Sequence, residues 1–228
     1  MDKNYAAGWN DLKTNNSWML FKIMGEFVDG FEKMGLHNPC ISIFGSARTP
    51  KEDPNYKLAT EIAKRIVGLG FGVITGGGPG IMEAANKGAQ EAGGASVGLT
   101  IDLTFEEKHN EFIDSNRLIN FDYFFIRKVM FVKYAQAFVV MPGGFGTLDE
   151  LLEAMTLIQT NKIKKFPIIL VGKSFWSGLV DWLKNTLIEK NKTISEVDLN
   201  LFICVDTPDE VIDILKKFYL ATETGPNF

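Results

Sequence analysis

The sequence predicts an α/β fold: a doubly wound parallel sheet with helices on both faces and an extra helix at the N-terminus. After Pro39, short apolar runs alternate with longer segments of helical periodicity. Two of the apolar runs lead directly into glycine-rich turns, and no linker divides the chain. Strands separated by helices form βαβ units, whose sheets are parallel and buried on both faces. We therefore expect a single domain over residues 1–228.

The N-terminal extension, residues 1–38, begins with a predicted helix over 17–34, and Gly35 follows as a stop signal. Its apolar residues recur at helical spacing: Trp18, Leu20, Phe21, Ile23, Met24, Phe27, Val28, Phe31 and Met34. This stripe is wide, so we expect the helix to pack on the main domain or on a second subunit.

The α/β core, residues 39–228, contains the remaining elements. Strands are expected at 40–44, 71–75, 96–99, 137–141, 167–171 and 201–205, with 118–121 as a candidate extra strand. Helices are expected near 55–69, 80–92, 122–135, 147–160, 174–189 and 208–220. The polar stretch at 100–116 fits neither pattern, and we expect it to form a lid or a subunit contact.

Composition excludes several classes of protein. The 24 Lys and Arg against 28 Asp and Glu give a net charge of −4, which argues against nucleic-acid binding. The N-terminus lacks the features of a signal peptide, and no run approaches the roughly 18 apolar residues of a membrane span. Cys40 and Cys204 lie in or beside apolar runs, as buried thiols of a reducing compartment do. We expect a cytoplasmic protein without a membrane partner.

Ligands of doubly wound sheets bind outside the carboxyl ends of the strands, where the strand order reverses. The first loop at such an end is Gly45-Ser46-Ala47-Arg48-Thr49. Gly45 allows backbone to approach a ligand, Ser46 can donate a hydrogen bond, and Arg48 supplies charge. A plain strand-to-helix turn is the alternative interpretation.

The second loop is glycine-rich and opens a helix. Gly76, Gly77 and Gly78 precede a proline and a fourth glycine, and N–H groups at a helix start attract anions. Met82 either lines a pocket or belongs to the core. Glu83 either faces a ligand or only interacts favourably with the helix dipole.

The third loop contains Gly143, Gly144, Gly146 and Thr147, and Glu150 follows in the predicted helix. A buried strand again leads into a glycine-rich turn and a helix, which predicts a second anion site. Thr147 and Glu150 also match the capping box, so Glu150 has the alternative role of capping backbone amides.

Neither glycine-rich loop fits the dinucleotide fingerprint or the Walker pattern, so hydride transfer and nucleoside-triphosphate hydrolysis lose support. What remains is binding of a phosphate, within a small mononucleotide. Two histidines, His37 and His109, lack spaced metal-ligating partners, and we expect no metal.

A basic pair, Arg127 and Lys128, interrupts the apolar segment 123–134. A helix this apolar is expected to be largely buried, so both cations must reach water, an acid or an anionic ligand. Cations near a helix N-terminus are also disfavoured by the helix dipole, which suggests another reason for their position.

Together these residues resemble the LOG family of nucleoside-monophosphate phosphoribohydrolases, long labelled lysine decarboxylase-like. The family's mark, Pro-Gly-Gly-x-Gly-Thr-x-x-Glu, is matched from Pro142 to Glu150, and its Arg-Lys pair by Arg127 and Lys128. Its glycine-rich loop ending in Met resembles residues 76–82. Ile126 replaces the Glu of plant-type members, and the chain looks like the longer bacterial branch.

The resemblance implies a Rossmann-like fold, a dimer or larger homo-oligomer, and no metal or organic cofactor. It also implies hydrolysis of the N-glycosidic bond of a nucleoside 5′-monophosphate, either AMP-like or a cytokinin riboside monophosphate. The hypothesis places the phosphate on the glycine-rich turns, with Ser46, Met82 and Glu83 lining the base and ribose pocket. Lys128 either adds its field or contacts the phosphate. Glu150 faces the ribose carbon, and Arg127 orients Glu150 or the ribose and neutralises charge at the phosphate. The alternatives are a non-catalytic nucleotide or molybdenum-cofactor carrier and a structural subunit.

Overall fold

The computed structural model describes residues 4–37, 39–101 and 109–228, with side chains from Ser17 onward. Its seven strands form one parallel sheet in the order β4-β3-β2-β1-β5-β6-β7, so the strand order reverses between β1 and β5. The predicted parallel sheet is confirmed, and the candidate strand at 118–121 is its edge strand. The strands are β1 (Cys40–Phe44), β2 (Gly72–Thr75), β3 (Ser96–Ile101), β4 (Leu118–Phe121), β5 (Ala135–Val140), β6 (Ile168–Val171) and β7 (Ile203–Val205).

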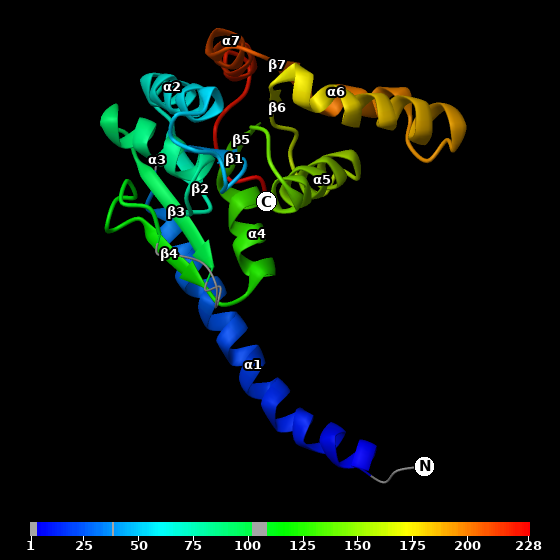
Figure 1. The fold of residues 1–228 in the computed structure, drawn as a ribbon. Helices are drawn as coiled ribbons and strands as arrows, with labels where there is room; N and C mark the ends of the chain where they lie inside the picture. The colour runs from blue at the N-terminus through cyan, green and yellow to red at the C-terminus, as the bar shows by residue number, and fades with distance from the viewer. Residues whose placement is uncertain (1–3, 38, 102–108) are drawn as a thin grey trace.

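Helices cover both faces of the sheet (Figure 1). One buried cluster joins the sheet to α2 (Pro54–Gly68), α3 (Ile81–Glu91) and α7 (Pro208–Tyr219). A second cluster joins the opposite face to α4 (Phe124–Tyr134), α5 (Phe145–Gln159) and α6 (Lys173–Trp182). Alternate residues of the strands point to opposite faces. Ile41 and Ile43 therefore enter the first cluster, and Phe44 enters the second.

Two of the expected elements toward the C-terminus differ from the structure. The helix expected over 174–189 is α-helical only to Trp182 and continues as a π-helix, η1 (Leu183–Lys190). The strand expected from 201 starts at Ile203, because a short 3₁₀ helix, η2 (Glu196–Leu201), precedes it. A capping box between Ser195 and Asp198 fixes the start of η2.

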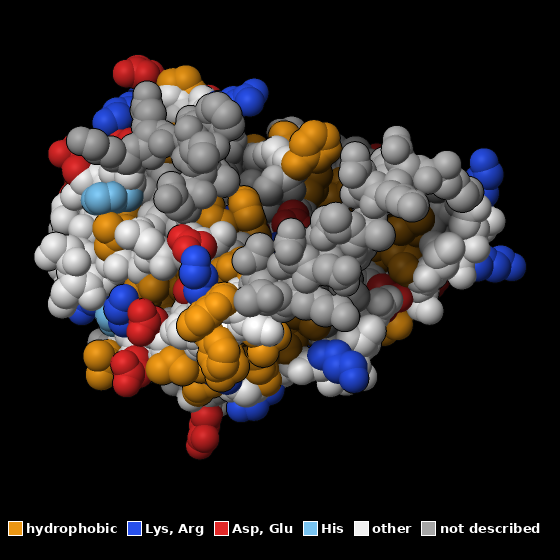
Figure 2. All heavy atoms as spheres, turned by 90° about the horizontal axis from the view of Figure 1, so that it is seen from below, with side chains coloured by type: hydrophobic (Ala, Val, Ile, Leu, Met, Phe, Trp, Pro, Cys, Tyr) orange, Lys and Arg blue, Asp and Glu red, His pale blue; other side chains and the backbone are white. Residues whose placement is uncertain are grey.

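The N-terminal helix α1 (Asn4–Gly35) is longer than expected and packs on the domain only near its C-terminal end. Met34 is buried there, and the backbone at Gly30 approaches Met130 of α4 so closely that a Cβ would lie 2.6 Å from its Cε. Trp18 and Phe21 remain 67% and 64% exposed. The helix projects from the domain in Figure 1, and Figure 2 shows hydrophobic side chains gathered on the surface seen from below. Packing on the main domain is thus confirmed only for the last turns, and a second subunit stays a prediction.

The expectation of a largely buried helix at 123–134 is wrong at its start. Ile126 and Met130 are buried, but Phe124 and Phe125 are about half exposed. At this end of α4 only one face of the helix is covered. The ring of Phe125 lies beside Phe27 of α1, with 6.5 Å between centroids.

The expected lid over 100–116 falls partly on residues 102–108, which lie outside the described residues. The part that follows packs on the sheet. Ile113 is buried against Gly98 of β3, where a Cβ would lie 2.4 Å from Ile113 Cδ1. Asn110 is also buried. Residues 109–116 therefore brace the sheet.

Cys40 is buried as expected, whereas Cys204 is partly exposed. Throughout the described ranges, no helix combines the length and apolarity that crossing a bilayer requires.

Candidate active site

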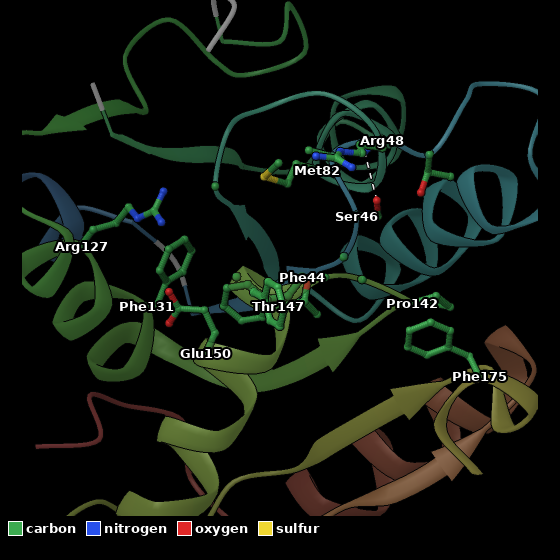
Figure 3. Close-up of a pocket in the computed structure, with 18 of the residues that line it drawn as sticks. Phe44, Ser46, Arg48, Met82, Arg127, Phe131, Pro142, Thr147, Glu150 and Phe175 are labelled. Carbon is green, nitrogen blue, oxygen red and sulfur yellow. Dashed lines mark hydrogen bonds between the residues drawn. The ribbon is translucent and has the colours of Figure 1, made fainter. Parts of the chain in front are cut away.

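A cavity of about 840 Å³ opens at the carboxyl ends of β1 and β5, where the strand order reverses (Figure 3). This is where doubly wound sheets bind their ligands. Ten of the residues predicted from the sequence line it: Gly45, Ser46, Gly76, Met82, Arg127, Gly143, Gly144, Gly146, Thr147 and Glu150.

The loop after β1 holds the two glycine-rich turns together. Ser46 N donates to Pro142 O and Ser46 O accepts from Ile81 N, each at 3.0 Å. Gly45 packs so closely on Ile81 that a Cβ would lie 2.6 Å from its Cγ2. A side chain at position 45 would therefore push the two turns apart.

The turn at 143–146 presents backbone N–H groups to the cavity. Helix α5 starts at Phe145, and the first N–H groups of any helix lack acceptors within the helix. Gly144 and Gly146 have nothing within 4 Å of a Cβ position, so this side of the turn is open. The positive end of the helix dipole and these amides suit an anion such as phosphate.

The capping-box interpretation of Glu150 is wrong. Gly144 is the N-cap residue of α5, and no side chain caps the helix. Thr147 is instead a buried residue within the first turn, and a Cβ at Gly143 would lie 2.1 Å from its Oγ1. Glu150 thus lies one turn into the helix with its carboxylate available to the cavity.

Burial dominates the electrostatics of Glu150. The residue is 5% exposed, and its Oε2 has no hydrogen-bond partner among the described residues. Burial raises the pKa of Glu150 to about 7, and the positive charges of Arg127 and Lys128 oppose this rise. Near neutral pH the group can both accept and release a proton, which is a property of catalytic carboxylates.

Arg127 shares the cavity with Glu150. Its guanidinium lies over the rings of Phe124 and Phe131, at 4.9 and 5.8 Å from their centroids. Figure 3 shows the Phe131 ring between the guanidinium and the carboxylate. A Cβ at Gly76 would lie 2.8 Å from Met82 Sδ and 3.9 Å from Arg127 Nη1, so Gly76 packs closely on Met82 and lies at contact distance from the guanidinium.

Lys128, by contrast, points away from the cavity. Its ammonium lies 2.8 Å from Asp149 Oδ1 and 2.7 Å from Glu153 Oε2. Adjacent residues of a helix differ by about 100° in direction, which separates Lys128 from Arg127. Lys128 affects the site through its field on Glu150 and not through contact.

Three further residues predicted from the sequence do not line the cavity. Asn110 Nδ2 donates to Gly77 O at 3.1 Å and to Gly78 O at 3.0 Å, so both glycines belong to an internal network. Glu83 accepts from Tyr56 Oη at 3.0 Å and pairs with Lys51 Nζ at 2.7 Å. Of the second loop, only Gly76 and Met82 reach the cavity.

The sequence interpretation omitted most of the aromatic lining. The additional lining residues are Phe44, Ala47, Arg48, Thr49, Phe124, Phe131, Pro142, Phe145 and Phe175. The chain has 18 Phe, and only the positions directly beside the glycine-rich turn carried a usable signal. Among the described residues, no group of three or more His, Cys, Asp or Glu is arranged to hold a metal ion.

Residues 82–215 match the protein family described as possible lysine decarboxylase. A protein of Mycobacterium tuberculosis (strain ATCC 25618 / H37Rv) named cytokinin riboside 5′-monophosphate phosphoribohydrolase is 34% identical over 144 residues, 62% of this chain and 75% of that protein. A rice protein (Oryza sativa subsp. japonica) of the same name, LOG, is 27% identical over 169 residues, 73% of this chain and 68% of that protein.

Solved structures show the same fold. The molybdenum cofactor binding protein of Rippkaea orientalis superposes with a TM-score of 0.59 and 22% identity, covering 81% of this chain and 99% of that one. The molybdenum cofactor carrier protein of Chlamydomonas reinhardtii superposes with a TM-score of 0.57 and 21% identity, covering 80% of this chain and 99% of that one. At these identities the likeness concerns the fold alone.

Proposed function

Because this chain belongs to the LOG family, also described as possible lysine decarboxylase, we propose that it hydrolyses the N-glycosidic bond of a nucleoside 5′-monophosphate. The products are the free base and ribose 5-phosphate. One observation carries the proposal: a buried carboxylate, Glu150, lines the cavity one helical turn beyond the open glycine-rich turn at the start of α5. The names of the mycobacterial and rice relatives support the same chemistry.

The proposal includes a position for the substrate. The phosphate binds the amides at 143–147, and one helical turn advances about 5 Å along the axis. That distance separates the phosphate of a mononucleotide from its ribose ring, so Glu150 lies beside the sugar. The part of the cavity that Arg127 and Met82 line then remains for the base.

The reaction exchanges two bonds at the anomeric carbon. The bond from C1′ to the base nitrogen breaks, and its electron pair leaves with the base, so positive charge develops on C1′ and the ring oxygen. The ionised Glu150 stabilises this charge and accepts a proton from the water whose oxygen bonds to C1′. The departing base takes up a proton from solvent. The positive charge of Arg127 favours the ionised form of Glu150 against the effect of burial and balances charge near the phosphate.

The proposal is tested by incubating the protein with AMP, GMP, CMP and UMP and measuring the base released. We expect Glu150→Gln and Arg127→Ala to lower kcat/KM by about 10²–10⁴-fold, because each removes a group that acts on the reacting centre. Glu153→Gln is the control, since Glu153 lies on the same helix and pairs with Lys128 outside the cavity.

Release that survives both substitutions unchanged would reject these roles. Absence of release from all four monophosphates, with a phosphorylated ligand retained through purification, would instead favour a carrier.

A further inference from the structure

The cavity continues beyond the turn that binds the phosphate in the proposed function. In Figure 3, Pro142 and Phe175 lie on one side of Thr147, whereas Glu150 and Phe131 lie on the other. A mononucleotide carries its phosphate at one end, so its sugar and base extend only toward Glu150. The space beside Phe175 is therefore left without a role in mononucleotide binding.

This second arm of the cavity presents one aromatic ring, and a second exposed ring belongs to the glycine-rich turn from which the arm leads. Phe175, in the first turn of α6, is 49% exposed, and its ring stands edge-on to Trp176 with 4.9 Å between centroids, which fixes its position. Phe145, at the start of α5, is 92% exposed and lines the same cavity. Exposed aromatic faces are platforms for nucleobases, and each stacked base contributes about 1–3 kcal/mol.

A cation lies across from the glycine-rich turn. Arg48 is exposed on the loop after β1 and lines the cavity, and Figure 3 shows it on the wall facing Thr147. Its backbone N donates to Ser46 Oγ at 3.1 Å, which orders the loop. Within the described ranges no carboxylate lies within 4 Å of its guanidinium, unlike the paired Lys128 and Lys173. A guanidinium of this kind suits a phosphate.

Resting on the proposed function, we propose that the cavity also binds pyrophosphate-linked dinucleotides, with a second base on Phe175 and Phe145. The first phosphate occupies the turn at 143–147, the second faces Arg48, and the second nucleoside fills the arm beside Pro142. The cleft crosses the carboxyl ends of strands on both sides of the reversal in strand order, which is how doubly wound folds accommodate two nucleotide halves. The missing dinucleotide fingerprint does not oppose this, because that motif places the pyrophosphate on the turn after the first strand.

The test compares the dissociation constants of AMP, ADP and diadenosine diphosphate by calorimetry. The full-length Glu150→Gln variant is used for all ligands, because it keeps the side-chain volume and slows hydrolysis. We expect diadenosine diphosphate to bind about tenfold or more tightly than AMP, with ADP between them, since stacking of one base corresponds to roughly 5–150-fold in affinity. A second substitution, Phe175→Ala or Phe145→Ala, is expected to remove the advantage of the second base. The preference for diadenosine diphosphate over AMP should then fall to the preference for ADP over AMP.

Trp182→Ala is the matched control, because Trp182 lies on the same helix, is also 49% exposed and does not line the cavity. It should leave the ratio as it was. Equal affinity for AMP and diadenosine diphosphate would overturn the proposal, as would a loss of AMP binding on Phe175→Ala as large as the loss for the dinucleotide. The proposed hydrolysis fails separately, if the unsubstituted protein releases no base from AMP while the preference for diadenosine diphosphate persists.

Discussion

The two glycine-rich turns resemble each other in sequence but serve different purposes in the structure. In the turn after β2, a Cβ at Gly77 would lie 2.4 Å from Thr100 Cγ2, and one at Gly80 would lie 2.4 Å from Ser46 O. Both glycines have positive φ, at 76° and 67°. In the turn after β5, Gly144 and Gly146 meet nothing within 4 Å. The first turn therefore uses its glycines for packing, and the second uses them to expose backbone.

Hydrogen bonding divides the two turns in the same way. Asn110 Nδ2 donates to two carbonyls of the first turn and, at 3.0 Å, to Asn86 Oδ1, which accepts from Thr75 Oγ1 at 2.5 Å. Beside the second turn, Glu150 Oε2 has no described partner. Buried polar groups are normally satisfied, and each exception calls for an explanation, such as a functional role. In the proposed function, the unsatisfied carboxylate beside the turn after β5 distinguishes it from the turn after β2, which its glycines alone do not.

The largest expected effect concerns the packed turn. Gly77→Ala should lower the free energy of unfolding by about 2–5 kcal/mol, because it adds left-handed backbone strain and overpacking against Thr100. Gly144→Ala, in open space and at a φ of −95°, should change it by less than about 0.5 kcal/mol. Urea unfolding of both variants measures the difference, and equal losses would show that the turns do not differ in this way.

The second-largest expected effect concerns how Glu150, beside the open turn, makes the stability of the fold depend on pH. Its pKa is raised from 4.5 in the unfolded state to about 7 in the folded state. Below pH 4.5 the carboxyl group is protonated in both states, and its contribution to the free energy of unfolding is fully present. This contribution is lost as the pH rises through 7, because the unfolded state ionises more readily. Glu150→Gln removes this loss and should raise the free energy of unfolding by about 2–3 kcal/mol at pH 8, with little change near pH 4.5. Thermal unfolding across this pH range measures it.

Glu153→Gln is the control for this prediction, because Glu153 pairs with Lys128 and its charge adds only a minor part to the rise of the Glu150 pKa, so its removal should bring a much smaller gain at pH 8. If the free energies of unfolding of Glu150→Gln and the unsubstituted protein differed by the same amount at every pH, the ionised Glu150 would not destabilise the fold, and the prediction would be wrong.

The sequence was sufficient for the sheet and for Glu150, but not for the orientation of the side chains around it. Buried parallel strands appear as apolar runs whatever their neighbours, so all seven could be located. Arg127 and Lys128 are adjacent and chemically alike, and only the packing of α4 in the folded domain turns one to the cavity and the other to Asp149. The same holds for Gly77, whose role depends on Thr100, a residue distant in sequence that no local pattern connects to it.

The smallest expected effect tests whether the open turn contacts an anion. Gly146→Ala replaces the second residue of α5 where no atom lies within 4 Å, so it should raise the free energy of unfolding by up to about 1 kcal/mol through helix propensity. Its methyl group nevertheless occupies open space on the turn that binds phosphate in the proposed function, and we expect about 3–10-fold weaker binding of AMP. Gly178→Ala, an equally open position within α6, should give a similar gain in stability without loss of affinity. Calorimetry and urea unfolding separate the two effects, and unchanged affinity in Gly146→Ala would mean that both turns serve the fold alone.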